Sequence, residues 1–199
     1  ANKEYVKGEA TNFPLYSSIA FDLTVTSVFT PLISGNAIYI YKNSNPELLL
    51  EKILMDNNVQ ILKLTPAHLN LLADCIEHCK IESTKITKLI VGGDILTLDI
   101  CKRITELFNG NVHIYNEYGP TEATVGCMIY ESKPEDSELY ISTPIGIPAA
   151  NTQIYILNDN LKLIPFGYHG NLYIGGKGLS LRIFKSTKNH RRKIYQVTI

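Results

Sequence analysis

Between residues 46 and 115, hydrophobic side chains follow helix-like and strand-like patterns in alternation. In Pro46 to Asp56, apolar residues recur at helical spacing behind a proline, which is favoured in the first turn of a helix. Val59 to Leu64 is a short apolar run that is typical of a buried strand. The same order continues with predicted helices at Pro66 to Cys79 and Thr97 to Phe108, and with predicted strands at Lys88 to Val91 and Val112 to Tyr115. Thr97 is expected to cap its helix.

Strands that alternate with helices across short connections predict a parallel sheet with crossover helices. Ligands of such sheets lie beyond the carboxyl ends of the strands. This rule selects Lys63, the segment Gly92 to Asp94 and the segment Asn116 to Glu122. We therefore expect these three places to converge on one crevice.

After Pro144 the pattern changes to short strands and turns. Thr152 to Leu157 and Asn171 to Ile174 are predicted strands, and the polar stretch from Asn158 to Asn160 is a predicted turn. The predicted fold class is α/β, with a parallel sheet followed by a β-rich antiparallel segment.

Composition limits the possible partners. The 199 residues are 45% hydrophobic and carry 19 basic and 19 acidic side chains, which is ordinary for a globular chain without a strong overall field. The apolar stretch from Ile33 to Tyr41 is too short for a membrane span and is interrupted by Gly35 and Asn36. We expect no nucleic-acid partner, no membrane partner and a cytoplasmic location.

Four scattered cysteines are expected to be reduced thiols. Cys75, His78 and Cys79 fall within one helical turn, but no second ligand pair stands at zinc-site spacing. The favoured interpretation of these residues is an ordinary helix face.

The segment Asn116 to Glu122, NEYGPTE, contains groups that a nucleotide site needs. Tyr118 offers a flat ring for stacking, Thr121 a hydroxyl, and Glu122 a hard oxygen ligand for Mg²⁺. By itself, the segment could also be a simple turn with a half-exposed tyrosine.

Together with four other segments, NEYGPTE resembles the adenylate-forming superfamily, and specifically the adenylation domains of non-ribosomal peptide synthetases. The matching segments are Phe21 to Thr24 (FDLT), Gly92 to Asp94 (GGD), Pro144 to Gly146 (PIG) and Gly170 to Gly178 (GNLYIGGKG). The resemblance covers residues 5 to about 181. It implies the partial large N-terminal subdomain of an adenylate-forming enzyme.

This resemblance implies that ATP and an amino acid react to give an aminoacyl-adenylate, which is then transferred to the phosphopantetheine thiol of a peptidyl carrier protein. Asp22 is implied to bind the substrate ammonium group, although a turn or helix-cap role for it stays open. Thr121 and Glu122 are the implied catalytic residues, with Glu122 holding Mg²⁺. The implied nucleotide-binding set is Gly92, Gly93, Asp94, Asn116, Tyr118, Gly119 and Thr121. Further implied partners are the peptidyl carrier and condensation domains of the same assembly line.

The family also implies which positions line the amino-acid pocket. They are Asp22, Leu23, Thr26, Lys63, Ile90, Gly92, Glu117, Val125 and Gly126. The set resembles that of asparagine-activating members. Independently of the resemblance, a lysine donor facing a carboxylate acceptor suits a primary carboxamide. Aspartate and glutamine are the nearest rival substrates. Another interpretation is that Lys63 and Glu117 only pair with each other, in a pair that could still open for substrate.

Several family features do not occur in the printed sequence: the phosphate loop, the ribose-binding aspartate and the C-terminal lysine. Asn171 also stands where the family usually has glutamate. We therefore expect residues 1–181 to be the central part of an adenylation domain that does not turn over by itself.

Residues 182–199 hold six of the nineteen basic residues and do not resemble the family. Reverse translation with permitted codons, read one base later, gives the family's expected continuation. We therefore expect an out-of-frame tail after a frameshift near Leu181 and Arg182.

Two other interpretations of the whole chain stay open. One is a non-catalytic remnant that still binds an amino acid. The other is a different nucleotide-binding α/β protein, such as a dinucleotide oxidoreductase, which the lack of a G-x-G-x-x-G segment disfavours.

Overall fold

The computed structural model describes residues 1–42 and 45–180, and a five-stranded sheet forms its centre. The strands lie in the order β3 (Ile61–Leu64), β4 (Lys88–Gly92), β5 (His113–Tyr118), β6 (Met128–Ser132) and β7 (Ile147–Pro148). The first three are parallel, whereas β6 and β7 are antiparallel to their neighbours. The predicted α/β class is confirmed, but the antiparallel part begins at Met128 rather than after Pro144, and it extends the parallel sheet itself.

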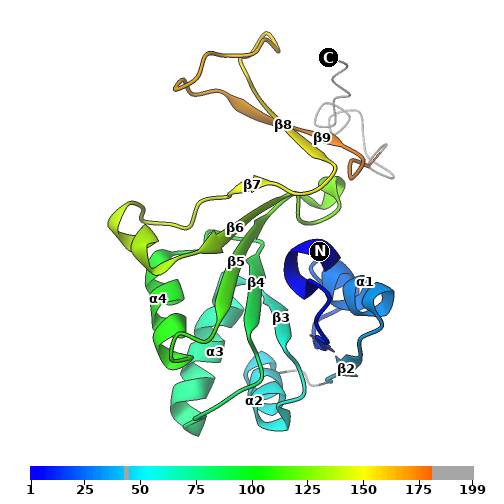
Figure 1. Ribbon diagram of the computed structural model, residues 1–199, viewed down its shortest axis with the longest axis vertical. Coiled ribbons are helices and arrows are strands. Elements are labelled where there is room, and N and C mark those ends of the chain that lie inside the picture. The colour runs from blue at the N-terminus through cyan, green and yellow to red at the C-terminus, as the bar shows by residue number, and fades with distance from the viewer. Residues whose placement is uncertain (43–44, 181–199) are drawn as a thin grey trace.

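Three helices cover one face of this sheet, as Figure 1 shows: α2 (Pro46–Asp56), α3 (Pro66–Cys79) and α4 (Leu98–Leu107). Leu62, Leu64, Leu89 and Val91 of the strands belong to the larger hydrophobic core between these two layers. The bounds of α2 and α3 agree with the sequence-based prediction, because each helix begins with a proline behind a polar cap residue.

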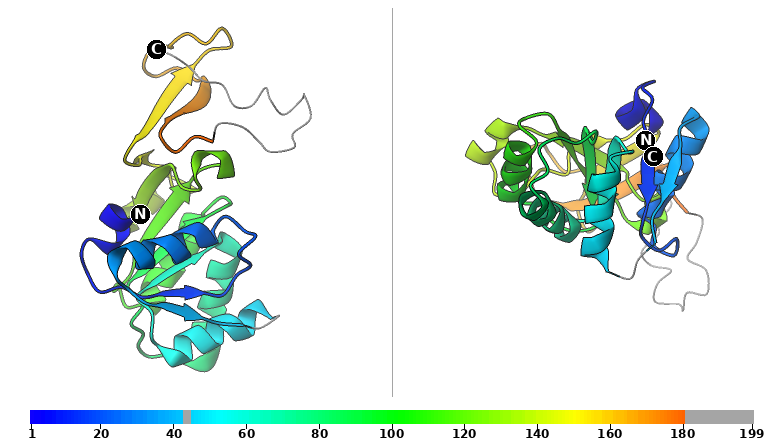
Figure 2. Two further views of the ribbon diagram at one scale, coloured as in Figure 1. Left: turned by 90° about the vertical axis from the view of Figure 1, so that its right-hand side faces the viewer. Right: turned by 90° about the horizontal axis from the view of Figure 1, so that it is seen from below.

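The N-terminal segments cover the opposite face (Figure 2). They are the π-helix η1 (Asn2–Val6), β1 (Phe13–Leu15), α1 (Thr24–Ser34) and β2 (Ile38–Ile40), with β1 and β2 paired in parallel. A smaller core lies here and contains Tyr5, Phe13, Ile61, Ile90 and Tyr115. Since side chains alternate along a strand, Lys63, Gly92 and Glu117 lie on this same face of the sheet.

The remaining strands, β8 (Thr152–Leu157) and β9 (Asn171–Gly176), form an antiparallel hairpin that extends from the main body in Figure 1. Ile154, Leu172 and Ile174 of the hairpin pack against a small core beside the 3-10 helix η2 (Thr121–Ala123). A second 3-10 helix, η3 (Pro134–Glu138), follows β6.

The structure corrects the sequence-based prediction at two further places. The hydrophobic pattern predicts that the strand from Val112 ends at Tyr115, but β5 continues to Tyr118, because residues 116–118 pair with 128–130 of β6. The first part of NEYGPTE is therefore strand rather than loop. Thr97 occupies the N-cap position of α4, yet its side chain makes no capping hydrogen bond.

The predicted tail, residues 182–199, lies outside the described residues. Among the helices of residues 1–42 and 45–180, none combines the length and apolarity that a membrane span requires.

Candidate functional site

A buried ion pair lies on the sheet face that the N-terminal segments cover. The Lys63 ammonium group on β3 donates to Oε2 of Glu117 on β5, and it also donates to Thr26 Oγ1 on α1 at 3.0 Å. The side chains of Lys63 and Glu117 are 0% and 6% exposed. The structure therefore brings together three predicted pocket residues from three elements, and the two charges pair with each other in this state.

Tyr5 is a fourth member of this network, and no sequence motif points to it. Its hydroxyl donates to Glu117 Oε1 at 2.8 Å, although the two residues are 112 positions apart. Burial, followed by the negative charge of Glu117, raises the pKa of Tyr5, so its hydroxyl remains a neutral donor. No local pattern identifies Tyr5, because its partner comes from a distant strand.

The turn after β5 closes the network from the other side. A methyl group at Gly126 would lie 2.5 Å from Glu117 Oε1 and closer still to the carboxyl carbon. Thr124 and Val125, immediately before it, both have left-handed backbone conformations with φ of 61° and 70°. Such values are rare for β-branched residues and often mark functional turns.

Strand register places two further members of the predicted pocket set beside the ion pair, and a third is buried at the start of α1. Ile90 is fully buried and pairs in register with Lys63, while Gly92 pairs in register with Glu117. Leu23 is buried at the N-cap position of α1.

Asp22 precedes α1 and meets the end of the NEYGPTE segment. The Thr121 hydroxyl donates to Asp22 Oδ2, which joins two chain segments 99 residues apart. The alternative turn role of Asp22 is also present, because its carbonyl accepts from the Val25 amide. Its carboxylate, however, faces Thr121.

A cavity of about 390 Å³ opens at the carboxyl ends of β4 and β5. Its lining includes Gly93, Asp94, Asn116, Tyr118 and Gly119, which are five of the seven residues predicted to bind nucleotide. The other two, Gly92 and Thr121, do not line it. Glu117 also lines this cavity, so the buried network and the cavity share one residue.

The last two motif segments are tied to the same place. Asn116 Nδ2 donates to the carbonyl oxygens of Thr143 and Pro144, which secures the PIG segment beside β5. Gly146 has a φ of 83°, and a methyl group there would lie 2.7 Å from the Tyr130 amide nitrogen, so only glycine fits. From the GNLYIGGKG segment, the Gly178 carbonyl accepts from the Thr124 hydroxyl. The GGD, NEYGPTE and PIG segments therefore line the cavity at the ends of β4 and β5, while FDLT contacts Thr121 and GNLYIGGKG contacts Thr124 in the turn that follows.

Glu122 is half-buried in η2, and its backbone carbonyl accepts from the Ser180 amide at 2.7 Å. Among residues 1–42 and 45–180, no group of three or more His, Cys, Asp or Glu side chains could hold a metal ion. A single carboxylate still fits Mg²⁺, which proteins commonly bind through one or two carboxylates together with substrate phosphates.

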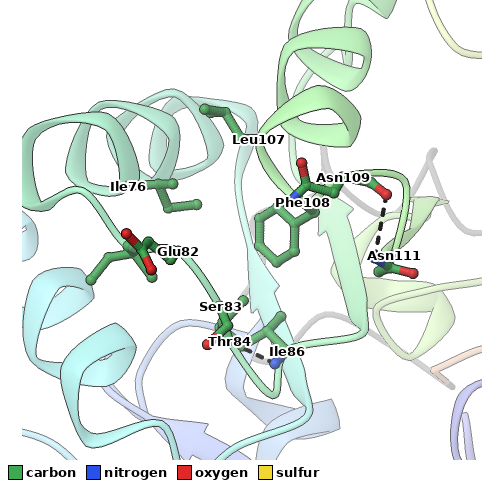
Figure 3. A pocket seen from close by; sticks show the side chains of 10 residues that line it. Ile76, Glu82, Ser83, Thr84, Ile86, Leu107, Phe108, Asn109 and Asn111 are labelled. Atoms are coloured by element: carbon green, nitrogen blue, oxygen red, sulfur yellow. Dashed lines mark hydrogen bonds between the residues drawn. The ribbon is translucent and has the colours of Figure 1, made fainter.

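Another cavity, of about 130 Å³, lies at the opposite end of the parallel strands (Figure 3). It is bounded by Ile76, Glu82 and Phe108, near the C-terminal ends of α3 and α4 and ahead of β4. Ligands of parallel sheets bind at the carboxyl ends of strands, so the larger cavity is the better candidate site.

Comparison with known proteins identifies the family of the chain. The AMP-binding enzyme family matches residues 2–184, and the chain belongs to this family. It is 47% identical over 193 residues to tyrocidine synthase 3 of Brevibacillus parabrevis, covering 97% of this chain and 3% of that protein. It is 49% identical over 181 residues to bacitracin synthase 3 of Bacillus licheniformis, covering 90% of this chain and 3% of that protein.

A solved structure shows the corresponding fold. PA1221, an NRPS protein containing adenylation and PCP domains, superposes with a TM-score of 0.81 at 22% identity. The match covers 96% of this chain and 38% of that one. The chain thus has the α/β fold of the N-terminal subdomain of such adenylation domains and spans a small part of the relatives' length.

Proposed function

We propose that this chain is the amino-acid-binding and adenosine-binding part of an adenylation domain that activates L-asparagine with ATP. The product would be an aminoacyl-adenylate for loading onto a peptidyl carrier protein, with a condensation domain in the same assembly line. The observation that carries the proposal is that the buried ion pair shares Glu117 with a cavity lined by the GGD, NEYGPTE and PIG segments, while the FDLT and GNLYIGGKG segments are hydrogen-bonded to the end of NEYGPTE and to the turn after it.

The ion pair supports a carboxamide substrate. Lys63 has three N–H donors, of which two have acceptors in the network, and Glu117 has lone pairs beyond those that Lys63 and Tyr5 use. A carboxamide can accept from Lys63 and donate to Glu117 if the pair opens slightly. Because the two charges cancel, an aspartate side chain would add an uncompensated negative charge, which disfavours it.

Asp22 is the proposed partner of the substrate ammonium group, since a carboxylate is the natural acceptor for such a cation. In the structure it accepts from Thr121. We propose that the substrate ammonium group replaces the Thr121 hydroxyl as the donor to Asp22. The Thr121 hydroxyl is then free to donate to a phosphate oxygen.

The cavity beside Glu117 is the proposed adenosine site. Its volume lies within the range of small-molecule pockets, and the Tyr118 side chain on its wall is 40% exposed and open to stacking. Glu122 is the proposed protein ligand of Mg²⁺, which would neutralise phosphate charge when bound. Gly93, Asp94 and Asn116 would surround the base.

Amino-acid-dependent exchange of pyrophosphate into ATP tests the proposal, using a complete adenylation domain that contains residues 1–180 of this chain. We expect kcat/KM for asparagine to exceed that for aspartate or leucine by about 100-fold. Equal activity with leucine and asparagine would overturn the substrate assignment. The 199-residue chain by itself is expected to show no exchange.

A matched pair of variants tests the role of the carboxylate. Glu117→Gln removes the acceptor charge and should reduce the preference for asparagine. Glu9→Gln is the control, because Glu9 also pairs with a strand lysine, Lys88, but is 61% exposed and lies outside the network. Glu9→Gln should leave the substrate preference unchanged.

A further inference from the structure

We propose that Tyr5 is a positioning residue of the amino-acid pocket, which fixes the Glu117 carboxylate so that it presents a defined acceptor to the substrate side chain. This inference rests on the proposed function and adds a residue that lies outside the family-derived pocket set. It also assigns a role to the N-terminal segment, which otherwise only covers the sheet.

The first support is the burial and packing of the Tyr5 ring. Tyr5 is 0% exposed and packs edge-on against Tyr115, with 5.2 Å between ring centroids and 67° between planes. Phe13, Ile61 and Ile90 complete its surroundings in the smaller core. Because the ring is packed by these residues, its hydroxyl has a defined position relative to Glu117 Oε1.

The second support is that each oxygen of the Glu117 carboxylate accepts a hydrogen bond from a different donor. Oε1 accepts from the Tyr5 hydroxyl, and Oε2 accepts from the Lys63 ammonium group. Gly126 contributes only backbone against the same carboxyl group. The carboxylate therefore cannot turn without losing a charge-assisted hydrogen bond in a buried place, which is costly.

The third support concerns charge. Tyr5 adds a donor to the network without adding a charge, so the sum over Lys63, Glu117, Tyr5 and Thr26 remains zero. Without that hydroxyl, Oε1 would lose its donor, and the carboxylate could rotate toward Lys63 and satisfy the ammonium group with both oxygens. The acceptor that a carboxamide needs would then point away from the substrate.

The test is Tyr5→Phe in the complete adenylation domain containing residues 1–180, which removes one oxygen atom and keeps the ring. We expect KM for asparagine to rise about tenfold, as for loss of a hydrogen bond to a charged group, while kcat changes less than about twofold. The ratio of kcat/KM for asparagine to that for leucine should fall about tenfold as well.

Tyr115→Phe is the matched control. It removes the same atom from the neighbouring ring, whose hydroxyl faces Glu131 rather than Glu117. Its KM for asparagine should stay within about twofold of the unmodified domain, because Phe keeps the ring that packs on Tyr5 and the lost hydroxyl interacts with Glu131 rather than with Glu117. Equal effects of the two variants on KM would overturn the positioning role. Thermal midpoints of both variants identify any loss of folding.

A double-mutant comparison separates this inference from the proposed function. If Tyr5 acts through Glu117, Tyr5→Phe should have a smaller effect in a Glu117→Gln background than in the unmodified domain. If the unmodified domain prefers an amino acid other than asparagine, the asparagine assignment is wrong. The Tyr5 inference is then judged with the preferred amino acid, and an undiminished effect of Tyr5→Phe in the Glu117→Gln background contradicts it.

Discussion

Gly126 has no side chain, and the Glu117 carboxylate occupies the space that a side chain at residue 126 would fill. Glu117 is held by Lys63 and Tyr5 on its two oxygens and by the Gly126 backbone on a third side. An added methyl group could be accommodated only by moving the carboxylate, because interiors are packed without spare volume. The position of the Glu117 carboxylate therefore depends on glycine at residue 126.

We predict that Gly126→Ala lowers kcat/KM for asparagine about 100-fold in a complete adenylation domain, since displacements near 1 Å have effects of this size. Pyrophosphate exchange measures the change. Gly175→Ala is the control, because a methyl group there meets its nearest atom at 3.4 Å, an ordinary contact, and φ is not in the left-handed region. Similar losses in both variants would show that the carboxylate is not confined as described.

The residues of the site differ in how far the sequence could predict them. Lys63 and the segment from Asn116 to Glu122 could be selected by the rule for the carboxyl ends of parallel strands. Glu117 lies within β5 rather than beyond it, and the structure pairs it with Lys63. Tyr5 could not be predicted, because nothing in the segment around it indicates a partner 112 residues away. The contact between Asp22 and Thr121 likewise depends on how α1 lies against the sheet, which no local pattern specifies.

Helix caps provide a comparison at the scale of elements. The Thr65 hydroxyl accepts from the His68 amide at the start of α3, whereas Thr97 at the start of α4 makes no such bond. We predict that Thr65→Ala lowers the free energy of unfolding by about 1 kcal/mol. Thr97→Ala should lower it by less than about 0.5 kcal/mol. Urea unfolding of the two variants checks this, and equal losses would contradict the assignment of caps.

Helix α1 explains why part of the fold was not predicted. Its buried residues are Thr24, Thr26, Ser27, Thr30 and Pro31. Its exposed apolar residues are Val25, Phe29, Leu32 and Ile33, with exposures from 36% to 70%. In α1 the polar residues are buried and the apolar residues are exposed, which is the reverse of the usual pattern. Hydrophobic periodicity therefore predicts that the exposed face of α1 packs against the protein. By contrast, α2 and α3 bury their apolar residues, and their bounds followed from the sequence.

The exposed stripe on α1 predicts self-association of the 199-residue chain, because contiguous apolar surface of this kind promotes contacts between molecules. Phe29→Ser combined with Ile33→Ser should shift the chain toward monomer in light scattering coupled to size-exclusion chromatography. The control is Leu48→Ser with Met55→Ser on α2, which also replaces two exposed apolar residues, at 48% and 60%. A shift of equal size in the control would mean that the α1 stripe has no special role.

At the scale of the whole molecule, the two faces of the central sheet differ in what packs against them. The face toward α2, α3 and α4 holds the larger core, and the face toward the N-terminal segments holds the smaller core and the polar network. Alternating helix and strand patterns predicted the parallel strands and the helices α2, α3 and α4. They did not reveal the N-terminal layer, because β1 and β2 are three residues each and α1 is reversed.

The hairpin of β8 and β9 is the part of the described molecule that we expect to open first. Its strands pair only with each other in their sheet, and only a small apolar cluster, with hydrogen bonds such as Thr124 to Gly178, attaches it. Regions with few buried contacts open at lower free energy than the core. In hydrogen exchange, amides of β8 and β9 should therefore exchange roughly 100-fold faster than those of β3 and β4.

Thr124→Val, which removes the hydroxyl and keeps the branched shape, should accelerate exchange in the hairpin and leave β3 and β4 unchanged. Uniform protection across both sheets would instead mean that the hairpin and the central sheet open as one cooperative unit.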